Sequence, residues 1–255
     1  MNLLSDLSGK HVLITGASTG IGAAVATQLA SLGAVVAVHG NRNAEAANEV
    51  VESIEKAGGR AAAVLGNLSE PEICGRIVAE AASALGGLDI LINNAGAMFD
   101  RVTNADFDEE VYQEVFDLNV KAVLSVTKAA FPHLKAAGGG SIINTGSVVG
   151  RMGGFSGSTV YAAAKAAVHS ITRNAAREFA PHAIRVNTVA PGFISTPFHA
   201  GTPAAIREQI ATQIPLQRLG DVQDCVGAFV FLASASMSAY ITGQILDVNG
   251  GQFMM

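Results

Sequence analysis

The amino-acid sequence predicts an α/β fold in which a mostly parallel β-sheet carries helices on both faces. Short runs of β-branched and apolar residues alternate along the chain with longer segments whose apolar residues recur at helical spacing. Runs that are apolar at every position suit strands that are covered on both faces. The seven expected strands are residues 11–15, 34–39, 61–65, 89–92, 141–145, 184–189 and 244–248.

The helices expected between these strands have recognisable ends. Gly33 closes the helix after the first strand, because glycine readily adopts the left-handed conformation that follows a helix. Ser69 and Glu72 form a capping-box pair at the start of another helix, and Asp106 with Glu109 forms a similar pair farther along. The alternation predicts right-handed crossovers and ligand binding at the carboxyl ends of the strands.

The composition indicates one globular domain over residues 1–255. Hydrophobic residues make up 49% of the chain and charged residues 15%, which provides for a sizeable core and excludes a disordered chain. No linker, charge run or low-complexity segment divides the sequence. The uncharged stretch 225–246 contains serine, threonine and glycine, so we expect a helix, a turn and a strand there rather than a membrane span.

Charge and cysteine content exclude several partners. A net charge of −5 and a pI near 5.6 argue against binding to nucleic acid or anionic lipid. Cys74 and Cys225 are too few and too far apart for a disulfide framework, and residues 1–10 lack the apolar run of a signal peptide. The histidines show no helical two-ligand spacing, so no metal is expected. The prediction is a cytoplasmic protein.

A glycine-rich turn follows the first strand, and a helix begins within it. The turn runs from Thr15 to Gly22 and contains Gly16 and Gly20. These glycines remove Cβ atoms that would keep a pyrophosphate away from backbone N–H groups, and the helix N-terminus adds a positive dipole end. A glycine turn without a ligand is the plain alternative. Its place after the first strand of an alternating chain favours a dinucleotide.

The end of the second strand bears on the choice of dinucleotide. An acidic residue at this point would bind the adenosine ribose of NAD, but the segment His39-Gly-Asn-Arg-Asn has no carboxylate. Arg42 can pair with a 2′-phosphate, and Asn41 can donate a hydrogen bond to it. NADP(H) is therefore favoured over NAD(H). In the alternative interpretation, Arg42 is a solvated residue before a helix that Asn43 caps.

Tyr161 and Lys165 lie four residues apart on the helix expected over residues 159–180, so their side chains share a face. A phenol with an ordinary pKa of about 10 is a poor acid or base at neutral pH. A neighbouring ammonium stabilises the phenolate, and we expect it to lower the pKa of Tyr161. This spacing also occurs by chance, so the pair needs support from other residues.

Polar residues after two further strands provide that support. Ser147 lies just beyond the strand 141–145, where its hydroxyl could hold a carbonyl oxygen. The segment Asn93-Asn94-Ala95-Gly96 follows the fourth strand. Asn119 sits within a helix, where asparagine is a mediocre former and its presence indicates another role.

Together these residues resemble the short-chain dehydrogenase/reductase family in its compact single-domain branch, over about residues 10–251. The glycine turn and the Asn-Asn-Ala-Gly segment match family motifs, and the catalytic tetrad maps onto Asn119, Ser147, Tyr161 and Lys165. The resemblance implies a Rossmann-type, doubly wound sheet. With the residues above, it assigns the cofactor to Gly16, Ser18, Thr19, Gly20, Ile21, Gly22, Asn41, Arg42, Asn67, Leu68, Asn94, Ala95, Gly96, Tyr161, Lys165, Pro191, Gly192, Ile194 and Thr196. Asn67 stands where the family more often has Asp.

The implied reaction is hydride transfer between nicotinamide and a carbonyl carbon. Ser147 would position the carbonyl oxygen and Tyr161 would protonate it. Lys165 would tune Tyr161 and bind the nicotinamide ribose, while Asn119 would link Lys165 to solvent through a water. Apolar side chains are expected to surround the substrate: Met98, Val149, Met152, Phe155, Phe193 and Phe198, alongside Ser147. Their other interpretation is ordinary packing. Residues 193–212 are expected to form a mobile lid.

Three functional hypotheses follow. The first is an NADP(H)-dependent carbonyl reductase or alcohol dehydrogenase of a small metabolite. The second is a 3-oxoacyl reductase acting on a carrier protein or CoA, although residues 136–138 and His182 replace basic residues of the carrier-protein enzymes. The third is an inactive nucleotide-binding regulator, against which the intact tetrad argues. The resemblance also implies a homotetramer.

Overall fold

The computed structural model describes residues 4–254 and contains one seven-stranded sheet in the order β3-β2-β1-β4-β5-β6-β7. Every neighbouring pair of strands is parallel. The strands are β1 (His11–Ile14), β2 (Val35–Gly40), β3 (Arg60–Leu65), β4 (Ile90–Asn93), β5 (Gly140–Thr145), β6 (Ile184–Pro191) and β7 (Ile245–Val248). All seven expected strands are present, shifted by at most two residues at either end.

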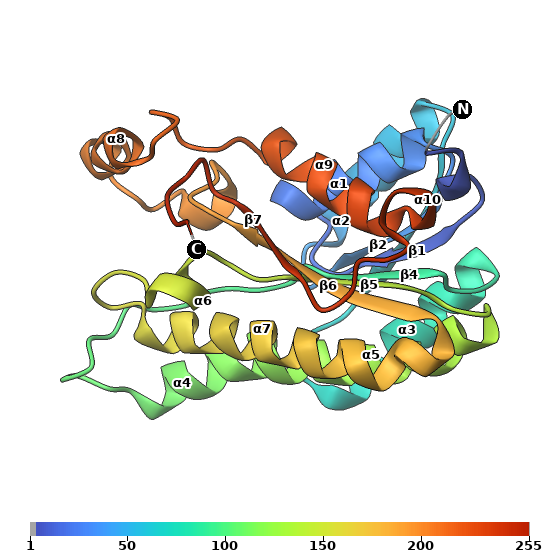
Figure 1. The fold of residues 1–255 in the computed structure, drawn as a ribbon, viewed down its shortest axis with the longest axis horizontal. Coiled ribbons are helices and arrows are strands. Elements are labelled where there is room, and N and C mark those ends of the chain that lie inside the picture. Colours follow the sequence, from blue (N-terminus) through green and yellow to red (C-terminus); the bar gives the residue numbers. More distant parts are fainter. Residues whose placement is uncertain (1–3, 255) are drawn as a thin grey trace.

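Two layers of helices cover the sheet (Figure 1). One layer holds α1 (Gly20–Ser31), α2 (Ala44–Lys56), α9 (Val222–Ala233) and the short α10 (Ala235–Ser238). The other holds α3 (Pro71–Leu85), α4 (Glu109–Phe116), α5 (Ala122–Ala136) and α7 (Thr159–Phe179). The short α6 (Val149–Met152) follows β5, and α8 (Ala204–Gln213) stands apart from both layers. No helix within residues 4–254 is long and apolar enough to cross a membrane.

Alternation along the strands divides the core into two halves. Val12 and Ile14 of β1 face the α1, α2 and α9 side, whereas Leu13 faces the α3, α5 and α7 side. Because successive side chains of a strand point to opposite faces, a strand apolar at every position packs against both layers. This confirms the prediction of a doubly wound, single-domain α/β fold.

The strand order places a crevice beside β1. The chain adds β2 and β3 on one side of β1 and then returns to add β4 on the other side. The connections after β1 and β4 therefore leave the sheet in opposite directions, and a gap opens at the carboxyl ends of these strands.

A buried chain of hydrogen bonds ties α7 to the sheet next to this crevice. Asn93 Nδ2 donates to Asn144 Oδ1 (2.9 Å), and Asn144 Nδ2 donates to Thr172 Oγ1 (2.8 Å) on α7. The Thr172 and Thr188 hydroxyls are 2.7 Å apart, which extends the chain to β6. Because buried polar groups are costly without partners, these bonds fix where α7 sits on the sheet.

Two helix starts differ from the expected ones. The residue that precedes α3 is Glu70 rather than Ser69, whose backbone N–H instead donates to the Asn67 side chain in a local turn. The residue that caps α4 is Asp108, which accepts hydrogen bonds from two backbone N–H groups. Asp106 instead bonds to Thr103. In both cases a nearer side chain or a local turn satisfies the backbone first.

Candidate active site

A cavity of about 1050 Å³ opens at the carboxyl ends of the central strands. Its wall includes Gly16 after β1, Asn94 after β4, Ser147 after β5 and Gly192 after β6. The expected ligand site of a doubly wound sheet and the principal cavity therefore coincide.

The glycine turn has the backbone of a phosphate cradle. Gly16 and Gly20 have φ values of +61° and +60°, which side chains with a Cβ adopt only with strain. A Cβ on Gly16 would also come within 2.8 Å of the Ala95 Cα. Helix α1 begins at Gly20, so its free N–H groups and positive dipole end face the cavity. The turn fits the pyrophosphate of a dinucleotide.

The segment after β4 braces this turn. Thr15 Oγ1 accepts hydrogen bonds from the backbone N–H groups of Asn94 (2.9 Å) and Ala95 (3.0 Å). In return, Asn94 Nδ2 donates to the carbonyl oxygens of Thr15 (3.0 Å) and Gly16 (2.9 Å). Four bonds thus hold the two loops as one unit, which explains the asparagine after the fourth strand.

His39 is a further brace that sequence reasoning did not identify. Its Nδ1 accepts a hydrogen bond from the Gly16 N–H (3.0 Å), and its Nε2 lies 2.9 Å from the Gly66 carbonyl oxygen. These partners require the neutral imidazole with the proton on Nε2. Burial lowers the pKa of His39, which is consistent with this form. A lone histidine that ends an apolar strand was the available signal.

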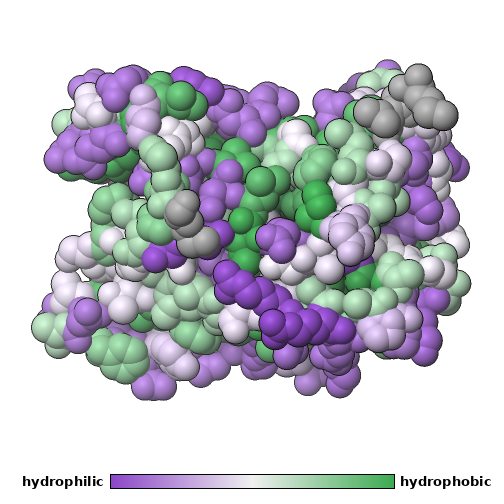
Figure 2. Space-filling view, in the orientation of Figure 1, coloured by the Kyte–Doolittle hydropathy of each residue, from purple (hydrophilic) through white to green (hydrophobic). Residues whose placement is uncertain are grey.

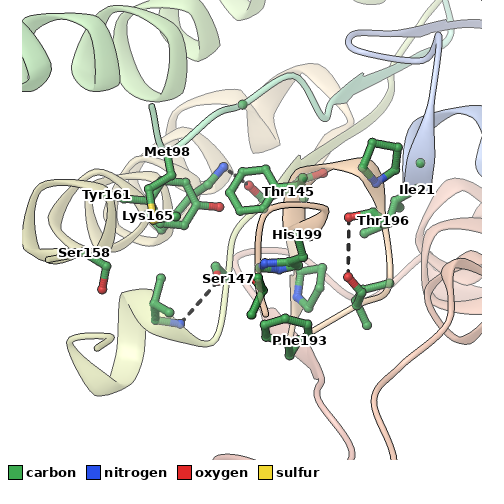
Figure 3. A pocket seen from close by; sticks show the side chains of 18 of the residues that line it. Ile21, Met98, Thr145, Ser147, Ser158, Tyr161, Lys165, Phe193, Thr196 and His199 are labelled. Atoms are coloured by element: carbon green, nitrogen blue, oxygen red, sulfur yellow. Dashed lines mark hydrogen bonds between the residues drawn. The ribbon is translucent and has the colours of Figure 1, made fainter. Parts of the chain in front are cut away.

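Tyr161, Lys165 and Ser147 meet on the opposite wall (Figure 3). The Lys165 ammonium lies 5.5 Å from the centre of the Tyr161 ring, and Ser147 lines the same cavity. Burial raises the pKa of Tyr161, and the nearby Ser147 side chain opposes that rise. The prediction that the Lys165 ammonium lowers the pKa of Tyr161 is therefore wrong for the chain without a ligand, because the effect of desolvation is larger.

Lys165 is almost fully buried and donates a hydrogen bond to the Thr145 carbonyl oxygen (3.0 Å) at the end of β5. Burial lowers the pKa of Lys165 to about 8. The side chain is therefore mostly an ammonium at neutral pH, held by a carbonyl oxygen that accepts its hydrogen bond.

Asn119 lies behind this pair in a π-helical turn, η2 (Asp117–Lys121), between α4 and α5. Its Nδ2 donates to the carbonyl oxygens of Ala97 (2.7 Å) and Val115 (2.9 Å), whereas its buried Oδ1 has no partner within residues 4–254. A Cβ on Gly96 would lie 2.7 Å from this Oδ1 and 3.1 Å from Lys165 Nζ. Glycine at 96 thus lets the amide oxygen and the ammonium face one space.

His169, one turn beyond Lys165 on α7, packs behind Ser147. A Cβ on Gly150 would come within 2.9 Å of the His169 Cε1, and the Nε2 crowds Gly146 in the same way. Burial, assisted by the charges of Arg151, Arg173 and Lys165, lowers the pKa of His169 to about 4. The imidazole is therefore neutral, and its ring leaves no room for a Cβ at Gly146, next to Ser147, or at Gly150, three residues beyond it. Sequence reasoning did not single it out.

Most of the residues expected at the site line the cavity. These are Gly16, Ser18, Thr19, Gly20, Ile21, Asn41, Leu68, Asn94, Ala95, Gly96, Met98, Ser147, Val149, Phe155, Tyr161, Lys165, Pro191, Gly192, Phe193, Ile194, Thr196 and Phe198. Five do not: Gly22, Arg42, Asn67, Asn119 and Met152.

The residues outside the cavity wall have identifiable surroundings. Gly22 is buried under the turn, where a Cβ would strike Gly16 and Asn94. Arg42 is exposed next to Asn41, which does line the cavity. Asn67 uses its side chain for local bonds to Ser69 and Glu70, and Met152 is exposed and does not line the cavity.

Aromatic rings fill the half of the cavity opposite the glycine turn. The Phe198 ring lies 5.6 Å from the Tyr161 ring, and the His199 imidazole stacks on Phe193 at 3.9 Å. Figure 3 shows His199 and Ser147 on the same side of the cavity, with Thr196 and Ile21 beyond. Sequence reasoning named the phenylalanines but missed His199. No group of three metal-ligating side chains occurs among residues 4–254.

This chain belongs to the short-chain dehydrogenase/reductase family. Its fold and its cavity indicate this family, and both a family model and solved structures match the chain over nearly its whole length. The family model described as enoyl-(acyl carrier protein) reductase matches residues 16–252. The protein is accordingly an oxidoreductase that acts on CH–OH groups with NAD(P).

Individual relatives are similar over nearly their whole length. The 3-oxoacyl-[acyl-carrier-protein] reductase FabG of Staphylococcus aureus is 40% identical over 96% of this chain and 98% of its own. The cis-4-hydroxycyclohexanecarboxylate dehydrogenase of Sinomonas cyclohexanicum is 38% identical over 95% and 96%.

Solved structures give the same result. An NADH-dependent reductase A1-R′ responsible for alginate metabolism has a TM-score of 0.91 at 41% identity, over 98% of this chain and all of that one. A 7α-hydroxysteroid dehydrogenase complexed with NADH and 7-oxo glycochenodeoxycholic acid has a TM-score of 0.93 at 34% identity, over 98% and 97%.

The buried ammonium predicts a pH dependence of stability. The pKa of Lys165 is about 8 in the folded chain against an ordinary 10.5, so between these values the unfolded chain binds more protons and stability rises with pH. Relative to Lys165→Met, the wild type should gain about 2 kcal/mol of unfolding free energy between about pH 7 and 9.5. Urea denaturation across this range measures the gain. Lys128→Met, which removes an exposed ammonium from α5, is the control, and a gain equal in wild type and Lys165→Met contradicts the assignment.

Proposed function

We propose that the protein is an NADP(H)-dependent oxidoreductase that interconverts a ketone and a secondary alcohol of a small metabolite. One observation carries this proposal: a single cavity joins a glycine-turn phosphate cradle to a half-buried tyrosine and serine and a buried lysine. When bound, the nicotinamide supplies or accepts the hydride. Gly16, Gly20 and the α1 N-terminus would hold its pyrophosphate, and Ile194 and Thr196 its carboxamide.

Tyr161 is the proposed acid and base. Its raised pKa keeps the phenol protonated at neutral pH, which is the form that donates a proton to the carbonyl oxygen as hydride reaches the carbonyl carbon. Ser147, which lines the same cavity, would bond to the same carbonyl oxygen and orient it. In alcohol oxidation the same two groups act in reverse.

Lys165 and Asn119 would help to return a proton to Tyr161 after it has donated one to the substrate. The ammonium beside the ring stabilises negative charge on the phenol oxygen after the proton has left. The unpaired Asn119 Oδ1 faces the same space as Lys165 Nζ, so a water there could bond to both. Such a water would connect Lys165 to solvent, and Lys165 would also bind the nicotinamide ribose.

Preference for the phosphorylated dinucleotide rests on the end of β2. No carboxylate follows this strand, Asn41 lines the cavity, and Arg42 stands exposed beside it, where a 2′-phosphate would emerge toward solvent. Relatives use both forms, since solved structures include the NADH-dependent reductase A1-R′ and a Burkholderia cenocepacia short chain dehydrogenase in complex with NADP. Asn67 and Leu68 would lie near the adenine.

A second candidate is a 3-oxoacyl reductase acting on a carrier protein or CoA. It is favoured by FabG relatives at 40% identity and disfavoured by the segment Ala136–Gly138 and His182, which lack the expected basic residues. Acetoacetyl thioesters assayed beside free ketones separate the two. An inactive regulator is the least supported, because such a protein has no use for the Tyr161 and Lys165 pair.

We further propose that residues 193–212 close over the substrate. Phe193, Phe198 and several residues of α8 line the cavity, yet α8 has no buried residue of its own. A helix held by so few buried contacts can move as substrate enters. Met98, Val149 and Phe155 would form the fixed apolar wall, whereas Met152 would reach the substrate only if α6 rearranged.

A homotetramer in the cytoplasm is the proposed setting. Leu124 on α5 and Tyr240 before β7 are 49% and 104% exposed, and hydrophobic side chains gather over β7 on the face that Figure 2 shows. Copies of the chain could cover both surfaces. Two buried, unpaired cysteines suit a reducing compartment. Sedimentation as a monomer contradicts the assembly.

Removal of the Tyr161 hydroxyl tests the reaction. Tyr161→Phe should lower turnover of the best ketone from a panel by about 10²- to 10⁴-fold, because proton donation is lost, while NADPH affinity stays unchanged. Absorbance at 340 nm follows turnover, and fluorescence titration measures affinity. Tyr112→Phe, on α4 outside the cavity, is the matched control. Full activity in Tyr161→Phe refutes the role.

Loss of the Arg42 charge tests the cofactor. Arg42→Ala should raise the dissociation constant of NADPH by about 10- to 100-fold and leave that of NADH nearly unchanged, since only NADPH has the 2′-phosphate. Isothermal titration gives both constants. Arg60 is an exposed arginine at the amino end of β3, whereas the cavity lies at the carboxyl ends of the strands. Arg60→Ala should therefore change neither dissociation constant. Equal losses for the two dinucleotides overturn the preference.

A further inference from the structure

Two arginines flank the substrate half of the cavity. Arg101, in the segment between β4 and α4, lines the cavity wall, and its Cβ lies against Gly157. Arg207 on α8 lies just outside the cavity wall, next to the lining residue Ile206, and donates a hydrogen bond to the Ser195 hydroxyl (3.1 Å). Among residues 4–254, neither guanidinium forms an ion pair with a carboxylate. Both therefore keep their charge available to a ligand.

The imidazole of His199 lies in the field of these two charges. Burial, followed by the positive charges of Arg101 and Arg207, lowers the pKa of His199 to about 4. The ring is therefore neutral and stacks on Phe193 at 3.9 Å. A neutral imidazole keeps one N–H donor without adding a charge of its own. This corner of the cavity combines positive potential with a hydrogen-bond donor.

Asp100 is the one acid among the described residues that line the cavity, and it does not cancel the field. Asp100 lines the cavity next to Arg101, while Arg101, Arg207 and the buried Lys165 contribute three positive charges. The net charge of the chain is −5, so the positive charge around this part of the cavity is opposite in sign to the net charge of the molecule. A cleft of one sign concentrates ligands of the other.

The charged corner is a short distance from the reacting groups. The Phe198 ring lies 5.6 Å from the Tyr161 ring and 4.9 Å from the His199 ring. A ligand whose oxygen meets Tyr161 and Ser147 would pass this apolar face before it reaches His199. The cavity thus has a polar end, an apolar middle and a cationic end.

We propose that the substrate is a ketone or secondary alcohol that carries a carboxylate, bound at its far end by Arg101, Arg207 and His199. This assignment rests on the proposed function and specifies its substrate class. Guanidinium groups bind carboxylates by paired, charge-assisted hydrogen bonds, so the pair would provide orientation as well as affinity.

Matched ketones test the proposal: 4-oxopentanoate and 4-oxocyclohexanecarboxylate, each beside its methyl ester. The wild type should show a higher kcat/KM for each carboxylate than for its ester. Arg101→Ala and Arg207→Ala should lower the carboxylate value by about 10- to 100-fold each and leave the ester value nearly unchanged. Lysine at either position should restore part of the loss, and Asp100→Asn should raise the carboxylate value. Arg177→Ala, an exposed arginine on α7, is the control.

A binding measurement separates this proposal from the reaction itself. Tyr161→Phe loaded with NADPH is titrated calorimetrically with each carboxylate and ester, with and without the arginine changes. Selective carboxylate binding that the arginine changes abolish supports the anion site even if no ketone is turned over, in which case the proposed reaction alone fails. Esters bound and reduced as well as carboxylates, or equal losses for both in the arginine variants, overturn the anion site and leave the reaction standing. If the protein neither binds nor reduces the carboxylates or the esters, the anion site is contradicted as well.

Discussion

Burial of a phenol and an ammonium side by side is the constraint around which the site is organised. Lys165 is almost fully buried and Tyr161 is partly buried, and the loss of solvation raises the pKa of Tyr161 and lowers that of Lys165 to about 8. The protein compensates with the Ser147 hydroxyl for one group and the Thr145 carbonyl oxygen for the other. Each partner comes from the end of β5, so a single strand sets both groups in place.

The same strand ends connect chemistry to ligand binding. The Asn93–Asn144–Thr172 bonds fix α7 on the sheet, while the Thr15–Asn94 bonds fix the glycine turn. Two adjacent asparagines, Asn93 at the end of β4 and Asn94 directly after it, therefore brace the two walls of one cavity. In a parallel sheet, neighbouring strand ends meet at one edge, which is why loops distant in sequence can share such braces.

Sequence patterns were sufficient for the sheet, for most cavity residues and for the Tyr161 and Lys165 pair, because these depend on local periodicity and on motifs at strand ends. They were insufficient where a residue depends on its surroundings. His39 looked like part of an apolar strand until its two hydrogen bonds were seen, and the net effect of burial on the pKa of Tyr161 could not come from spacing. Arg101 has no motif, and only the folded chain brings it to Arg207 and His199.

The π-helical turn at Asp117–Lys121 makes the long helical segment sensitive to its length. There the Ala122 N–H bonds to the carbonyl oxygen five residues back instead of four, so the turn accommodates one additional residue. Each residue of an α-helix rotates the chain by about 100°. Deletion of one residue elsewhere in α4 or α5 would turn the residues between the deletion and the π-helical turn by that angle, whereas deletion within Asp117–Lys121 would close the backbone into a continuous helix and remove the turn that carries Asn119. Substitution of a surface residue along this stretch would therefore leave the positions of α4 and α5 side chains unchanged, whereas deletion of a single residue would not.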